Sequence, residues 1–368
     1  MSNIIDTIAS VGILISNIFY NFKLSILLPL LIYYIKENKG TPYYIIILNP
    51  LISAIVFGII YIMGNCDVPD YIEFDTNRSK KKLLIISGLF NTLSNILILY
   101  TSELSRVSIL LQIIILTSNV FITDILIKYF TYRNLKIING YTITSIIMMI
   151  GTFMIPIIYQ IITNNFNKYD ILWIILNISG IVSKSISILL HEKYIEENVN
   201  NLKTQLEMTI INNTLQTIIC IAIINMDWIP IIGYSQKKGF IEVSKNTINL
   251  FFEGKSITVI VIGIAYTLSY IGNQLNNIFL SITELKNKYY MNPRYVSIIT
   301  PISVIILYTV ATSINYGIKY PLYINIIVML MIIISLIIWN KYKVSNNTLD
   351  KQINAVIVNT RNYNYGDL

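Results

Sequence analysis

Long apolar segments alternate with short polar connections along the whole chain. A window of roughly 20 residues, the length that a helix needs to cross a bilayer, finds ten such segments. They are 8–34, 43–63, 83–101, 108–129, 138–159, 171–190, 205–226, 257–280, 295–313 and 320–339. The pattern predicts ten transmembrane helices. The first segment is too long to cross upright and carries Asn21 and Lys23 near its middle, so we expect it to be tilted or kinked.

The composition places most of the chain in lipid. Hydrophobic residues make up 54% of the sequence and charged residues 12%, and the mean hydropathy is +0.63, values beyond the range of soluble domains. We therefore expect an all-α integral membrane protein whose main partner is the lipid bilayer. The opening stretch MSNIID carries no basic region and no small-residue cleavage site follows it, so we expect the first segment to be retained.

The positive charges indicate an orientation. The net charge of +8 lies between the apolar segments rather than on one basic face, so it favours a topology signal and argues against nucleic-acid binding. Alternate connections, together with the C-terminal tail, hold sixteen Lys and Arg, against five in the others when the long 229–255 connection is left aside. This bias predicts that both termini lie in the cytosol.

A short internal echo predicts two related halves. NILILYTSEL at 95–104 resembles NIFLSITEL at 277–285 when one gap is allowed. Five segments separate the two stretches, an odd number, so the halves would have opposite orientations, which is a transporter architecture. The predicted units are a first five-helix half (1–162), a second five-helix half (163–340) and a polar, disordered cytosolic tail (341–368).

The segment 108–129 carries an acid within its apolar run. At roughly 100° per residue, Gln112 and Asn119 share one stripe, whereas Asp124 shares another with Lys128, four residues further on. One interpretation is an ion pair between Asp124 and Lys128 near the membrane interface. The other is a proton-coupling carboxylate that faces a cavity.

Five other segments also carry one polar face each, and 171–190 has the longest. Interhelical hydrogen bonding would use the same residue types, and Lys184 could reach the headgroups instead. Six polar faces together are more typical of the lining of a shared aqueous cavity. The candidate substrate-binding residues are Asn21, Asn91, Asn95, Gln112, Asn119, Asn177, Lys184, Asn212, Asn273 and Asn277.

Enzyme signatures are missing from the sequence. His191 is the only histidine, Cys66 and Cys220 are too few for a zinc site, and H-E-x-x-H, G-x-S-x-G and P-loop patterns do not occur. An intramembrane aspartyl protease needs two aspartates in adjacent membrane segments, and Asp124 has no such partner. We expect neither an enzyme nor a bound metal or cofactor.

Several stretches resemble one transporter family. They are ILLQIIILTSNVFITDILIKYF followed by YRNLKIINGY, then HEKY, YIGNQLNN and SIITP. Together with ten segments and a long connection between the seventh and eighth, they resemble the chloroquine-resistance-transporter-like family of the drug/metabolite transporter superfamily, from about Asn17 to Trp339. The resemblance implies two inverted five-helix halves, with helices one to four and six to nine around a central cavity and helices five and ten at the periphery. It also implies transport of amino acids, peptides or amphipathic drugs, often out of acidic digestive compartments, and hence a vacuolar or endolysosomal membrane.

The chain departs from that family in two respects. The 229–255 connection has no cysteines to staple it, and Asn273 and Gln274 stand where relatives can carry acids. With Lys184 and Lys23 facing inward, we expect a neutral to positive cavity that favours zwitterionic or anionic solutes over cationic drugs.

The function predicted from these features is alternating-access transport of a small organic solute, coupled to protons through Asp124. The alternatives are a nucleotide-sugar or triose-phosphate antiporter with cavity lysines as phosphate clamps, and a transport-inactive scaffold or receptor. Peripheral fifth and tenth helices are compatible with a monomer or a homodimer.

Overall fold

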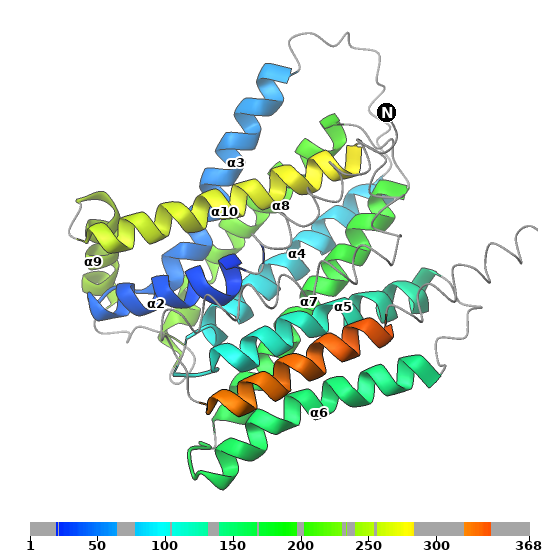
Figure 1. Cartoon of the computed structure of the whole chain (residues 1–368). Coiled ribbons are helices and arrows are strands. Elements are labelled where there is room, and N and C mark those ends of the chain that lie inside the picture. Colours follow the sequence, from blue (N-terminus) through cyan, green and yellow to red (C-terminus); the bar gives the residue numbers. More distant parts are fainter. Residues whose placement is uncertain are drawn as a thin grey trace, which may run out of the picture.

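The structure is a computed structural model made of helices throughout the part of the chain that it describes (Figure 1). That part comprises residues 20, 22–64, 78–103, 105–131, 140–167, 169–196, 202–229, 233, 240–253, 256–282 and 320–339. The predicted segment 295–313 and the tail 341–368 lie outside it, as do residues 8–19 and 21 of the first segment.

Eight of the ten predicted segments correspond to described helices. The longer helices are α3 (Ile45–Gly64), α4 (Arg78–Thr101), α5 (Ile109–Thr131), α6 (Gly140–Ile162), α7 (Asp170–Glu196), α8 (Leu202–Ala222), α10 (Ile257–Ile282) and the helix Leu322–Trp339. The described end of the first segment is a π-helical turn, η1 (Lys23–Leu27), that leads into α2 (Leu28–Glu37). Short 3-10 turns, η2 (Pro42–Tyr44) and η3 (Ile224–Trp228), precede α3 and follow α8.

Six described helices are long and apolar enough to cross a membrane. They are Pro42–Gly64, Lys82–Thr101, Gly140–Ile162, Asp170–His191, Ile257–Asn276 and Leu322–Trp339. Their outward faces carry large apolar side chains, such as Ile147 on α6 at 62% exposure and Leu268 on α10 at 64%, which suit contact with lipid. The protein is therefore an all-α membrane protein, although six such helices are fewer than the ten predicted.

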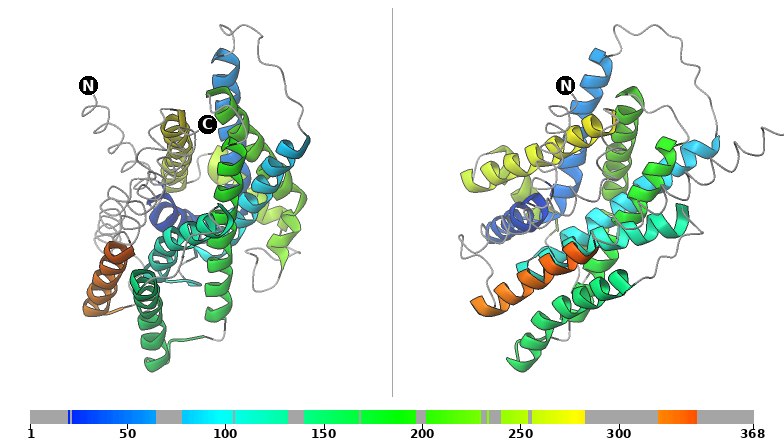
Figure 2. Two further views of the ribbon diagram at one scale, coloured as in Figure 1. Left: turned by 90° about the vertical axis from the view of Figure 1, so that its right-hand side faces the viewer. Right: turned by 45° about the vertical axis from the view of Figure 1, so that its right-hand side comes forward.

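Two reciprocal serine pairs join antiparallel helices. Ser87 of α4 and Ser187 of α7 each donate to the other's backbone carbonyl at 2.9 Å. Ser145 of α6 and Ser335 of the helix Leu322–Trp339 do the same at 2.8 and 3.0 Å. Small residues of this kind let membrane helices approach closely, and the hydrogen bonds then hold the pair. Figure 2 shows the two helices of each pair lying side by side.

The helices form two apolar clusters, and α5 and α7 contribute residues to both. One cluster surrounds Ile32 and Tyr43 and joins α2, α3, α4 and α10. The other surrounds Ile113, Trp173 and Val328 and joins α5, α6, α7 and the helix Leu322–Trp339. In Figure 1 these groups lie in the upper left and lower parts of the molecule.

The long connection before α10 contains a helix that the hydropathy pattern did not predict. This helix, α9 (Phe240–Phe252), is amphipathic and buries Ser244, Thr247 and Leu250. The Thr247 hydroxyl accepts a hydrogen bond of 2.7 Å from the backbone N–H of Thr41, at the start of η2. The described part of this connection is therefore held by packing rather than by cysteines.

The connections predicted to share one side of the membrane meet at one end of the structure. Lys36, after α2, binds Glu103, after α4, and Arg106 donates to the carbonyl of Gly233 in the α8–α9 connection at 3.3 Å. Tyr320 at the same end accepts a 2.6 Å hydrogen bond from Gln160 near the end of α6. The alternation of connections is thus consistent with the prediction, while the side that faces the cytosol stays a prediction.

Candidate functional site

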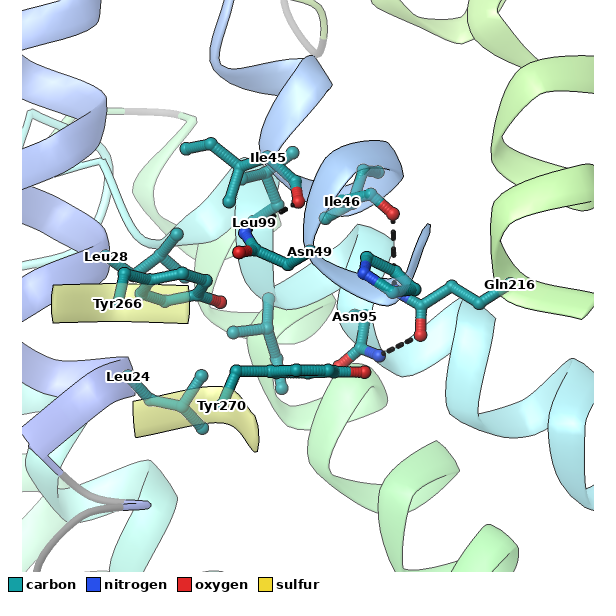
Figure 3. A pocket seen from close by; sticks show the side chains of 12 residues that line it. Leu24, Leu28, Ile45, Ile46, Asn49, Asn95, Leu99, Gln216, Tyr266 and Tyr270 are labelled. Carbon is teal, nitrogen blue, oxygen red and sulfur yellow. Dashed lines mark hydrogen bonds between the residues drawn. The ribbon is translucent and has the colours of Figure 1, made fainter. Parts of the chain in front are cut away.

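A small cavity of about 10 Å³ lies between η1, α2, α3, α4, α8 and α10. Aliphatic side chains make most of its wall, and the phenol rings of Tyr266 and Tyr270 form one side (Figure 3). Its polar groups are the amides of Asn49, Asn95 and Gln216. A cavity of this size has room for about one water molecule, so an organic solute could enter only if the surrounding helices moved apart.

A proline within α3 positions Gln216 at this cavity. Pro50 has no N–H, so the carbonyl of Ile46, four residues earlier, loses its partner within the helix. Gln216 of α8 donates to that carbonyl at 3.4 Å, and its own side-chain oxygen accepts a 2.7 Å hydrogen bond from Asn95 of α4 (Figure 3). The freed carbonyl therefore ties α3, α8 and α4 together at the cavity wall.

Lys184 joins the same network from α7. Its ammonium donates to the side-chain oxygen of Asn91 at 2.6 Å, and the Asn91 amide nitrogen lies 3.4 Å from the Gln216 oxygen. The lysine therefore points inward between α7 and α4, rather than along the helix toward the headgroups. Asn91, Asn95 and Lys184 of the predicted site are brought together, because Gln216 accepts from both asparagines and Lys184 donates to Asn91.

A second polar group surrounds Asn213 on the next turn of α8. The Asn213 amide donates to Ser53 of α3 at 3.0 Å and to Gln274 of α10 at 3.1 Å. Its oxygen accepts a 2.9 Å hydrogen bond from the Tyr270 hydroxyl. Since Tyr270 also lines the cavity, this group fixes one wall of it. Each buried polar atom in this set thus has a partner, as buried groups require.

Lys23 is the second lysine near the cavity. It begins the π-helical turn η1 and is only 5% exposed. Its ammonium lies 4.5 Å from the ring centre of Tyr270, 5.9 Å from that of Tyr266 and 5.4 Å from that of Tyr20. Ring faces attract cations, so the tyrosines form a cage around this charge. π-helical turns frequently occur at functional sites.

The polar face predicted for 171–190 consists of residues three or four apart, namely Asn177, Gly180, Lys184, Ser187 and His191, and much of this stripe faces α4 instead of the cavity. A Cβ at Gly180 would lie 3.2 Å from Leu97 and Ile98 side-chain atoms, and Ser187 pairs with Ser87. This part of the stripe is an interhelical contact, the alternative interpretation of such patterns. Asn177 on the same stripe is buried at 4% exposure.

The remaining predicted residues lie elsewhere or outside the described side chains. Gln112 donates to the carbonyls of Ser102 and Val107, at 3.2 and 2.8 Å, and so holds the α4–α5 connection. Asn119 accepts a 2.7 Å hydrogen bond from Ser185 and joins α5 to α7. Asn212 has a buried side-chain oxygen beside Gly88 with no described partner, and Asn273 is partly buried. The side chains of the other three predicted residues, Asn21, Asn277 and Asp124, lie outside the described residues. Both hypotheses for Asp124 therefore stay open.

A charged group closes the end of the molecule where the connections meet. We call it the Glu103 cluster: Lys36, Glu103, Ser105 and Arg106. Lys36 and Ser105 donate to one Glu103 oxygen, the latter at 2.7 Å, and the Arg106 Nε lies 3.1 Å from the other oxygen. Burial raises the pKa of the Glu103 carboxyl, but the hydrogen bond from Lys36, joined by its charge and the neighbouring groups, outweighs this and leaves the pKa below its usual value.

The Glu103 cluster is continuous with further polar contacts at this end. Arg106 donates to the carbonyl of Tyr100 at 2.8 Å, and its guanidinium carbon lies 4.2 Å from the ring centre of Trp173 on α7. Beside it, the fully buried Asp227 accepts a 2.7 Å hydrogen bond from Thr41. These contacts tie α2, α4, α7, α8 and their connections into one closed surface.

Sequence patterns identified the asparagines of α4 but not the partners that complete the site. Asn213, Ser53 and Gln274 were not predicted as site residues, although Asn213 adjoins the predicted Asn212. Two adjacent asparagines within a membrane-length segment were the available signal. Among the described residues, no three His, Cys, Asp or Glu side chains come together to hold a metal ion.

Comparison with models of known protein families and with characterised proteins finds no match to this chain.

Proposed function

We propose that this protein is a secondary transporter that moves small organic solutes across an internal membrane by alternating access. The observation that carries the proposal is the convergence of polar side chains from α3, α4, α7, α8 and α10 around a cavity inside a bundle of apolar helices. Polar and charged groups at membrane depth are costly, and they are found where they serve a pathway or a solute site.

The packing of equivalent segments supports an architecture of ten helices in two inverted halves. A shift of five segments makes 43–63 equivalent to 205–226, and 138–159 equivalent to 320–339. In both pairs the helices pack directly and antiparallel: Tyr61 binds Glu207 at 2.8 Å in the first pair, and Ser145 binds Ser335 in the second. A two-fold axis in the membrane plane produces such contacts where it passes between equivalent helices. In this architecture, 8–34 and 295–313 supply the remaining helices.

The Glu103 cluster supports alternating access. A carrier must close one end of its solute pathway while the other opens, and ion pairs between connections suit that task because they can form and break without disturbing apolar packing. In the described conformation, the cluster joins the α2, α4 and α8 ends on one side of the cavity. Proton coupling through Asp124 belongs to the proposal on the sequence argument alone.

Uptake into liposomes tests the proposal. The purified chain is reconstituted and presented with labelled amino acids, short peptides, nucleotide sugars and sugar phosphates, with and without a pH gradient. Saturable uptake is expected, with loss in Gln216→Leu and retention in the matched surface variant Thr144→Ala on α6. Asp124→Asn should abolish only the part driven by the pH gradient. Folded protein that neither transports nor is thermally stabilised by any solute would favour the scaffold or receptor alternative instead.

A further inference from the structure

Pro50 divides α3 into two halves that are packed differently. The first half contributes its isoleucines at 45–47 to the larger apolar cluster, together with residues of α2, α4 and α10. Its start is also fixed through η2, because Thr41 donates a 2.7 Å hydrogen bond to the buried Asp227 and its backbone N–H donates to Thr247 of α9. The half of α3 nearest the Glu103 cluster is therefore held on several sides.

The second half, residues 51–64, buries a narrower face. In this fully described half, only Ser53 and Phe57 are buried, both at 0% exposure. Six large apolar side chains on its other faces are exposed: Leu51, Ile52, Ile55, Ile59, Ile62 and Met63. Figure 1 shows the end of this half projecting at the top of the molecule. Lipid tails are as apolar as these side chains, so a tilt of this half within the bilayer exposes nothing that lipid cannot cover.

Three residues spaced four apart, Ser53, Phe57 and Tyr61, join the second half to the bundle. Ser53 donates a 2.6 Å hydrogen bond to Gln274 of α10, and Tyr61 donates one of 2.8 Å to Glu207 of α8. Between them, Phe57 packs in a small apolar cluster with one buried side chain from each of these two helices. Residues at this spacing lie on one stripe of a helix. We call this stripe the α3 seam, and it can part when the second half tilts about a point that precedes it.

Pro50 supplies such a point. Because proline has no N–H, the carbonyl of Ile46 has no partner within the helix, and the Gln216 amide reaches it only at 3.4 Å. Proline positions are where helices bend. The cavity lies at this level of α3, since Ile46, Asn49 and Pro50 line it. A tilt of the second half about Pro50 would therefore widen the cavity toward the end of the molecule opposite the Glu103 cluster.

We propose that α3 is hinged at Pro50 and that its second half is a gate, which admits the solute at the end opposite the Glu103 cluster. The inference rests on the proposed transport function and names the part of the site that moves. A cavity with room for about one water molecule must widen before a solute enters, and parting the α3 seam widens it without moving the first half. The Glu103 cluster then stays closed while the other end opens, as alternating access requires.

Cysteine labelling measures the opening of the gate without a known solute. Cys66→Ser and Cys220→Ala remove the native thiols, and Ser53→Cys then places a thiol of similar size on the α3 seam. The full chain in liposomes is treated with a charged, water-soluble methanethiosulfonate. It should modify Ser53→Cys roughly tenfold faster, or more, than the control Ser145→Cys, which is equally buried between α6 and the helix Leu322–Trp339. Equal rates at the two positions would overturn the proposal.

Two variants locate the hinge and the seam. Pro50→Ala restores the missing N–H and should slow the labelling of Ser53→Cys roughly tenfold, the effect of one hydrogen bond on the opening equilibrium. Tyr61→Phe removes the hydroxyl that binds Glu207 and should make the labelling several-fold faster. Pro50→Ala should also melt at the same or a higher temperature, which excludes slow labelling through misfolding. Labelling that Pro50→Ala leaves unchanged would overturn the hinge.

Crosslinking connects the gate to transport. Tyr61→Cys with Glu207→Cys, joined by a bifunctional maleimide, should abolish uptake of any solute that the native protein takes up. The matched pair Ser145→Cys with Ser335→Cys, joined in the same way, should retain it. Uptake that survives the first crosslink would overturn the gate.

Two further outcomes separate this inference from its alternatives. Loss of uptake in both crosslinked pairs would mean that the two halves of the protein move as rigid bodies, and would overturn a gate confined to α3. Labelling that follows the expected pattern in a protein that takes up no solute would contradict the transport function and leave the hinge standing.

Discussion

Glu103→Gln tests whether the Glu103 cluster holds the closed end of the molecule. In the structure, the carboxylate receives hydrogen bonds from Lys36 and Ser105 and lies 3.1 Å from Arg106 Nε. Its side chain is 14% exposed, that of Arg106 11% and that of Lys36 39%. A glutamine keeps the shape of the side chain but removes the negative charge between two cations. The variant should therefore leave the positive charges of Lys36 and Arg106 close together with no carboxylate between them.

The expected loss in the free energy of unfolding is about 2 kcal/mol. Exposed ion pairs contribute about 0.2–1 kcal/mol, and breaking a fully buried pair costs about 3–5 kcal/mol. The contact with Lys36 should contribute an amount closer to that of an exposed pair, because Lys36 is partly exposed. The contact with Arg106 should contribute an amount closer to that of a buried pair, although Arg106 makes no hydrogen bond to Glu103 Oε2. The expected loss for the two contacts together therefore lies between the cost of an exposed pair and that of a fully buried pair.

The difference between the wild type and Glu103→Gln should depend on pH in a defined direction. The pKa of Glu103 in the folded protein lies below its value in the unfolded chain, about 4.3. The stability that the Glu103 carboxylate contributes is therefore fully present above its pKa in the unfolded chain, and it is lost as the pH falls through its pKa in the folded protein. The measured difference should be constant between neutral pH and about pH 5, and smaller at lower pH.

Denaturant titration in mixed micelles measures these quantities, with Glu37→Gln as the control. Glu37 lies one residue from Lys36, at the exposed C-terminal end of α2, and should change stability by no more than about 0.5 kcal/mol. Equal stability of the two variants at neutral pH would refute the reasoning. A difference that grows as the pH is lowered would refute the assigned direction of the pKa shift.

Two further predictions concern helix packing. Gly180→Leu should lower the free energy of unfolding by about 3 kcal/mol, because even a Cβ there lies 3.2 Å from α4 side-chain atoms. Gly272→Leu, where no atom of the described residues lies within 4 Å of the added Cβ, should be neutral, and equal melting temperatures of the two variants would contradict the α4–α7 contact. In a double-mutant cycle, Ser145→Ala and Ser335→Ala should show a coupling energy of about 1 kcal/mol, and additive losses would mean that the reciprocal hydrogen bonds do not stabilise the pair.

The apolar segments were predictable because hydropathy over a membrane-length window depends little on tertiary context. That same averaging hides α9, which is amphipathic and only 13 residues long. Its apolar and small residues recur three or four apart, at Val243, Thr247 and Leu250, but they lie in a connection that reads as polar overall. Such a helix is stable because its inner face packs on the bundle, and the sequence of the connection alone does not contain that partner.

The polar faces show what sequence periodicity predicts and what it does not. A period of 3.6 residues correctly places Gly180, Lys184 and Ser187 on one face of α7. It does not distinguish the part that meets another helix, at Gly180 and Ser187, from the part that reaches the cavity network, at Lys184. That distinction depends on how closely α4 approaches at each turn. Small residues such as Gly180 and Ser187 permit a close approach of the two helices. A lysine between them then lies against the other helix, where its charge needs a polar partner, and this was the available signal for the contact with Asn91.

Lys23 could be identified from the sequence as a charge within an apolar segment, but its surroundings could not. The segment turns π-helical at this residue, and each bond then spans five residues instead of four, so a stripe drawn at the α-helical period loses its phase there. The partners Tyr266 and Tyr270 lie more than 240 positions away along the chain, on a helix with many other polar residues. A composition with 27 tyrosines gives no reason to choose these two. Only the packing of η1 against α10 brings the ammonium over their rings.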